Sequence, residues 1–258
     1  MIVRKQTNGE LVLIGQTDHS RLVGQLAAHW GNEHFAKPAP YNSMVRAATF
    51  HDYGWLRYET SPLINPETGE PYNFLQVPLG SAQINSYQWS LDWMAGIDHY
   101  AGLIVSMHRT GLWKNRYDLM TNSSGYNLRQ MSLDVHEFVD RNERWQEHAR
   151  QSYDAEQLRT NYQLMQVWDL LGLYFCCREL SEDSVDPVPV DYSGNSIQLR
   201  MRPSSPREVT FEPYPFDRRP LKIHLAAKRL PRIAFESTED FQSEYFKSPN
   251  DLLSFELT

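Results

Sequence analysis

The sequence changes its pattern near Val185, and this change limits the folds that the chain can adopt. Before this point, apolar residues recur every three or four positions over long stretches, as they do on the buried face of a helix. After it, prolines separate short runs in which apolar and polar residues alternate, which is typical of strands with one buried face. We therefore predict a helical body followed by a small β-sheet.

The first residues are predicted to complete that sheet. Residues 2–14 contain two strand-like runs separated by Asn8-Gly9, a dipeptide that favours the tight turn of a β-hairpin. An isolated hairpin is only marginally stable in water, so this one should pair with the C-terminal strands. The predicted fold class is mainly α, with a small antiparallel β-sheet formed by the N-terminal hairpin and the C-terminal strands. The predicted domains are a helical domain over residues 15–183 and, packed on it, a sheet subdomain from residues 1–14 and 184–258.

Periodicity also predicts the individual elements. Three long helices are expected, over 82–112, 133–149 and 154–180. A short helix is expected over 237–246, because Ser237 and Asp240 have the spacing of a capping box. The strand candidates in the C-terminal part are 197–201, 209–211, 221–225, 232–235 and 253–257.

The composition argues against several classes of protein. The 258 residues are 41% hydrophobic and 22% charged, as in an ordinary soluble globular protein. A net charge of -7 argues against a surface dedicated to nucleic acid. No apolar run reaches the length of a membrane span, and the first residues lack the apolar core of a signal peptide. We expect a cytoplasmic protein without nucleic-acid or membrane partners, and the composition leaves its oligomeric state open.

The most informative local motif is the adjacent pair His51-Asp52, which follows a short apolar run. His51 continues the helical spacing of that run, so its ring is expected to point into the interior. The apolar residues that share this face are Met44, Ala47 and Ala48. Asp52 follows immediately, and burying an unpaired carboxylate is strongly unfavourable. A divalent metal ion bound by both side chains would remove this penalty.

Three more polar residues are predicted to lie on the apolar faces of helices. His19 lies near the start of a further helix expected over 17–30. His108 lies on the apolar face of the helix over 82–112, and Asp169 lies among apolar residues of the helix over 154–180. Each has an ordinary alternative, namely a histidine packed in the core or an acid that is hydrogen-bonded in the interior. The residues expected at the surface are His29, His99 and Arg109.

Four of these residues form the predicted metal site. They are His19, His51, Asp52 and Asp169. Two imidazoles and two carboxylates suit Mn²⁺, Fe²⁺, Ni²⁺, Co²⁺ or Zn²⁺, so the predicted cofactor is one divalent metal ion. The chain has no glycine-rich phosphate loop, no His-Glu-x-x-His and no Gly-x-Ser-x-Gly motif that would indicate another chemistry.

The ordered set of motifs resembles the HD superfamily of metal-dependent phosphohydrolases. The segments that carry the resemblance are the helix beginning at His19, residues 47–54 around His51-Asp52, and Trp168-Asp169-Leu170-Leu171. More narrowly, the whole chain is similar to a bacterial family designated DUF3891. This likeness lies in Thr17-Asp18-His19, His51-Asp52-Tyr53-Gly54-Trp55, Val105-Ser106-Met107-His108 and Pro215-Phe216.

The HD resemblance implies an HD-like helical bundle and hydrolysis of a small phosphoester or nucleotide. Asp52 would then orient a water molecule, and His108 would donate to the phosphate or the leaving group. Dinuclear HD proteins usually carry two more histidines on separate helices, whereas residues 58–98 contain none, which favours a single ion. Two alternatives stay open: a diiron oxygenase on the same scaffold, and a non-catalytic, metal-stabilised binding or sensor module.

Overall fold

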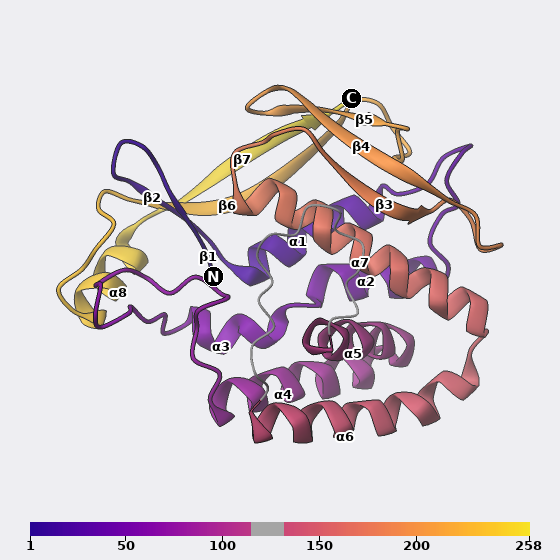
Figure 1. Ribbon diagram of the computed structural model, residues 1–258, viewed down its shortest axis with the longest axis horizontal. Coiled ribbons are helices and arrows are strands. Elements are labelled where there is room, and N and C mark those ends of the chain that lie inside the picture. The colour runs from indigo at the N-terminus through magenta and orange to yellow at the C-terminus, as the bar shows by residue number, and fades with distance from the viewer. Residues whose placement is uncertain (115–131) are drawn as a thin grey trace.

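A curled, seven-stranded β-sheet lies over a group of helices (Figure 1). The computed structural model describes residues 1–114 and 132–258. The strands are β1 (Ile2–Lys5), β2 (Leu11–Ile14), β3 (Asp183–Pro189), β4 (Ser196–Ser205), β5 (Glu208–Glu212), β6 (Leu221–Leu230) and β7 (Asn250–Leu257). The α-helices are α1 (Gln16–Ala28), α2 (Tyr41–Phe50), α3 (Leu56–Glu59), α4 (Ser81–Ile97), α5 (His99–Trp113), α6 (Leu133–Ala149), α7 (Ala155–Cys177) and α8 (Thr238–Lys247). Two short 3-10 helices are η1 (Tyr53–Trp55) and η2 (Arg150–Ser152).

The sheet combines strands from the beginning and the end of the chain. Its strand order is β1-β2-β6-β7-β5-β4-β3, in which β5 and β7 are parallel and all other neighbours are antiparallel. Leu11 of β2 pairs with Leu230 of β6, and Leu13 pairs with Lys228. The prediction that the N-terminal hairpin pairs with a C-terminal strand is therefore confirmed.

The predicted fold class, in contrast, is wrong. About 48% of the structure is helical and 22% is strand, and the sheet is a mixed half-barrel rather than a small antiparallel addition to an HD-like bundle. Part of the error comes from β3, where Pro187 and Pro189 conceal a strand because proline cannot donate to the hydrogen-bond ladder. β3 tolerates these prolines because it is an edge strand. The parallel pairing of β5 with β7 connects distant residues and leaves no periodic signal in the sequence.

Most predicted helices exist, and α6 has the predicted bounds. The helix expected over 82–112 is two helices, α4 and α5, because the backbone at Asp98 is extended. Asp98 begins the second helix by accepting a hydrogen bond from the backbone N–H of Ala101 at 3.0 Å. Ser237 caps α8 as predicted, through a bond from the Asp240 N–H at 3.1 Å. Residues 232–235 do not form a strand.

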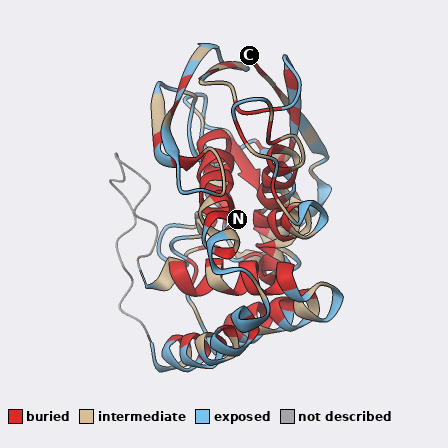
Figure 2. Ribbon diagram, turned by 90° about the vertical axis from the view of Figure 1, so that its right-hand side faces the viewer, coloured by how far each residue is buried: buried red, intermediate tan, exposed pale blue. Residues whose placement is uncertain are grey.

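The interior lies between the sheet and the helices. α1 packs against β6, and α7 packs against β1 and β3, so these two helices separate the sheet from α4, α5 and α6. Figure 2 shows buried residues throughout the central helices and exposed residues on the outer side of α6, the lowest helix in that view. Within the described ranges, no helix has the length and apolar character needed to span a membrane.

Candidate metal centre

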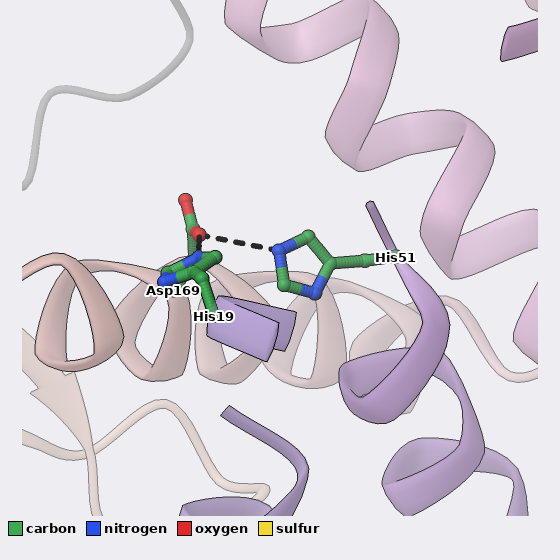
Figure 3. Close-up of side chains that lie close together, drawn as sticks. All are labelled: His19, His51 and Asp169. Atoms are coloured by element: carbon green, nitrogen blue, oxygen red, sulfur yellow. Dashed lines mark hydrogen bonds and ion pairs between the residues drawn. The ribbon is translucent and has the colours of Figure 1, made fainter. Parts of the chain in front are cut away.

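The four predicted metal ligands converge in the interior, and each is at most 5% exposed. His19 comes from α1, His51 and Asp52 from the turn after α2, and Asp169 from α7. The His19 Nε2 atom donates to Asp169 Oδ1 at 2.8 Å. The Nε2 atom of His51 lies 3.3 Å from the same oxygen and 3.6 Å from Asp52 Oδ2. Figure 3 shows the rings of His19 and His51 directed at the Asp169 carboxylate.

His51 and Asp52 occupy a corner of the chain. The sequence predicts a helix that continues to Gly54, but α2 ends at Phe50 and the chain turns directly into η1. The turn lets two adjacent side chains face the same point. The Nδ1 atom of His51 donates to the Ala48 carbonyl at 2.8 Å, which leaves Nε2 as the unprotonated nitrogen of the neutral ring.

Two close helix contacts bring the ligand-bearing elements together. A Cβ atom on Gly24 of α1 would lie 2.9 Å from the Thr49 Cα atom of α2. A Cβ atom on Gly172 of α7 would lie 2.7 Å from the Cε1 atom of His19. Both distances are shorter than real Cβ contacts, so only glycine permits these approaches. Gly172 lies one turn after Asp169 on the same face of α7, which places the carboxylate beside the His19 ring.

The prediction for Arg109 is wrong. Its side chain is buried, forms an ion pair with Asp52 Oδ1 and lies over the Tyr87 ring at 4.5 Å from the ring centroid. The sequence of α5 could have predicted this burial, because apolar residues occur on all sides of the helix. Such a helix is buried as a whole, and its few polar residues are buried with it. Arg109 is therefore a site residue that sequence reasoning missed.

His108 is next to the four predicted ligands. Its ring centroid lies 4.9 Å from that of His51. Ligand atoms of His51, Asp52 and His108 lie within 4.8 Å of one another, as do those of His19, His51 and Asp169. The two triads share His51, so His108 is close enough either to contact a substrate or to join the ligand set.

His29 and His99 lie outside this cluster. His29 Nδ1 bonds to Asp217 at 3.0 Å, and His99 Nδ1 bonds to the Tyr153 hydroxyl at 2.8 Å. His99 is exposed although it shares α5 with His108, because nine residues along a helix place the two rings on opposite faces. The prediction that these two histidines lie away from the site is confirmed.

Burial and charge oppose each other at the site. Burial lowers the pKa of His51, but the Asp52 and Asp169 carboxylates outweigh it and raise the pKa above its ordinary value. Burial raises the pKa of Asp169, but the hydrogen bond from His19 and the nearby rings of His51 and His108 hold it well below its ordinary value. Burial also raises the pKa of Asp52, but the nearby His51 and Arg109 side chains outweigh burial and lower this pKa below its ordinary value. Both carboxylates are therefore ionised at neutral pH.

The described residues fit a divalent metal ion. Two ligand atoms that bind one ion at about 2.1 Å lie roughly 3.0–3.4 Å apart in octahedral or tetrahedral geometry. The contacts of 2.8, 3.3 and 3.6 Å among His19, His51, Asp52 and Asp169 are close to this range. Among the described residues, the buried His51 Nε2 has no hydrogen-bond partner, as expected of an atom reserved for a ligand.

Comparison with known proteins identifies the family. Residues 1–232 match the model of a family described as "Protein of unknown function (DUF3891)", and the chain belongs to this family. The comparisons do not support the assignment to the HD superfamily. No curated protein and no solved structure matches the chain.

Proposed function

We propose that this protein is a divalent-metal-dependent hydrolase that cleaves a small phosphoester or nucleotide. Its ion would be held by His19, His51, Asp52 and Asp169. The observation that supports this most is the buried His51 Nε2 atom, which faces two carboxylates and has no hydrogen-bond partner among the described residues. A polar atom buried in this way is unfavourable unless a further group binds to it.

The charge of the site suits an anionic substrate. Two ionised carboxylates and the Arg109 guanidinium together leave one negative charge when the imidazoles are neutral. A divalent ion would reverse this to one positive charge in a buried environment. Such a site attracts anions, and phosphoesters are anions at neutral pH.

The side chains would divide the remaining tasks. When bound, a divalent ion supplies Lewis acidity and lowers the pKa of a coordinated water from 15.7 to roughly 7–9. Arg109 binds Asp52 Oδ1, so Oδ2 stays directed at the metal site and can orient that water. Burial lowers the pKa of His108 to about 3, so its ring is neutral at pH 7. His108 would therefore bind the phosphate or leaving group through a neutral N–H.

The first test is elemental analysis of purified protein, followed by a screen of nucleotides and phosphoesters with Mn²⁺. We expect about one divalent ion per chain and hydrolysis of at least one class of phosphoester. Two irons per chain would favour the diiron oxygenase instead. A metal-free protein would favour the binding module, and a metal-loaded protein that cleaves no phosphoester would contradict the proposed activity.

The role of His108 has its own test, with His99 on the same helix as the matched control. His108→Ala should keep its metal and lose about 10²–10³-fold in activity, because a hydrogen-bond donor to the reacting group is removed. His99→Ala should keep both metal and activity. Loss of metal from His108→Ala would instead show that His108 is a ligand.

A further inference from the structure

A side chain from a distant segment caps the N-terminus of α1. The helix begins at Gln16, and its N-cap residue Gly15 has no side chain that could cap it. Glu59, the last residue of α3, takes this role. Its Oε1 atom accepts hydrogen bonds from the backbone N–H groups of Gln16 and, at 3.3 Å, Thr17. Its Oε2 atom accepts a bond from the Thr17 hydroxyl at 2.6 Å.

This cap adjoins the turn that carries His19. The backbone N–H of His19 donates to the Gly15 carbonyl at 2.9 Å, which closes the first turn of α1. Gln16 and Thr17 are both buried, so their N–H groups cannot turn to water if the carboxylate is lost. Removing Glu59 therefore favours unwinding of the turn that positions the His19 ring.

Glu59 is also firmly connected to the His51-Asp52 corner. η1 and α3 follow Asp52 without a break, and the Trp55 N–H donates to the Asp52 carbonyl at 2.9 Å. Trp55 and Tyr58 are buried and anchor this segment in the interior. One carboxylate thus joins the helix that carries His19 to the segment that carries His51 and Asp52.

We propose that Glu59 is a positioning residue that fixes His19 relative to His51 and Asp52 for metal binding. The inference rests on the proposed metal site and adds the device that holds its elements together. Glu59 acts through the first turn of α1, because the hydrogen bonds that it accepts come from Gln16 and Thr17. Its effect should depend on the hydrogen bonds that it accepts and not on its charge.

Titration with Co²⁺, followed by visible absorption, tests this because the spectrum reports the coordination of the ion. Glu59→Ala should bind Co²⁺ at least about tenfold more weakly, as losses next to a metal site do, and with an altered spectrum. Glu59→Gln should bind almost as wild type, since its amide oxygen still accepts from the backbone and its NH₂ group can donate to Thr17. Equal weakening in both variants would indicate a charge effect and overturn the proposal.

Ser237→Ala provides a matched control. It removes the side-chain cap of α8, which carries none of the proposed ligands, and should leave the Co²⁺ Kd and spectrum unchanged. If Glu59→Ala does not fold, Thr17→Val keeps the test available, because it removes the hydroxyl contact alone and should give a smaller shift in the same direction.

The outcomes separate this inference from the proposed function. Wild-type protein that binds Co²⁺, together with a folded Glu59→Ala variant of unchanged Kd and spectrum, overturns the positioning role alone. Wild-type protein that binds no Co²⁺ overturns the metal site and this inference with it.

Discussion

The interior beneath the sheet and the centre between the helices are both buried, but they are built from different residues. Under the sheet, apolar side chains such as Phe211 and Ile223 are buried, while charged pairs such as Arg202 with Glu212 stay at the surface. The helical centre instead buries ionised groups, including Asp52, Asp169 and Arg109.

This difference separates a region that serves stability from one that favours ligand binding. Burying an ion costs several kcal/mol even in a real protein, and well-packed apolar residues often stabilise a fold as well or better. Under the sheet, the interior of this protein is formed by such well-packed apolar residues. Buried charges with perturbed pKa values are concentrated at functional sites, which supports a binding role for the helical centre.

The largest expected effect tests the sheet side. Phe211→Ala should lower the free energy of unfolding by about 3–5 kcal/mol, because it leaves a cavity beside the Phe216 ring, 5.4 Å away between centroids. Urea denaturation followed by circular dichroism would measure this loss. The folded fraction should bind as much Co²⁺ as wild type does. A parallel loss of metal binding would contradict the separation of the two regions.

The next effect tests the helical centre. Asp169→Asn keeps the size of the side chain but removes the charge that faces His19 and His51, so the metal Kd should rise at least about 100-fold, or about 2.7 kcal/mol. Asp217→Asn, which changes the surface partner of His29, is the matched control and should leave the Kd unchanged. Added metal should also raise the unfolding midpoint of wild type and not that of Asp169→Asn. Equal midpoint shifts in both proteins would remove Asp169 from the ligand set.

Periodicity and capping spacing in the sequence predicted the individual helices and strands of the two regions better than the way in which these elements pack and pair. The bounds of α6 and the Ser237 cap follow from periodicity and capping spacing, which depend on neighbouring residues alone. The break at Asp98 was missed because apolar residues continue on both sides of it. The half-barrel could not be predicted, because the two prolines of β3 conceal a strand, and the parallel pairing of β5 with β7 joins distant residues that local alternation cannot match.

The candidate site shows the same limit. Its proposed ligands were found because a charged or imidazole side chain on an apolar helical face is an anomaly that a single sequence reveals. Arg109 and Glu59 were missed because their roles depend on contacts with residues 57 and 43 positions away. Such contacts are set by tertiary packing and have no counterpart in local spacing.

The smallest effect concerns Asp98, an acid whose charge the protein itself satisfies. Burial raises the pKa of Asp98, but hydrogen bonds from the Ala101 N–H and the Ser43 hydroxyl, together with Arg46, outweigh burial and lower it. Asp98→Ala should therefore cost about 1 kcal/mol of stability, the usual value of an N-cap, and leave metal affinity unchanged.

Because the folded-state pKa of Asp98 is depressed, its contribution is fully present above the ordinary pKa of about 3.9. It is lost as the pH falls through the lower folded-state value. The stability difference between wild type and Asp98→Ala should be constant from pH 5 to 7 and decrease below about pH 4 in urea titrations. Asp98→Asn should keep part of the cap through its amide oxygen and show a weaker pH dependence. A difference that stays constant into acid would mean that Asp98 contributes through its shape and not through its charge, in contrast to the buried acids of the helical centre.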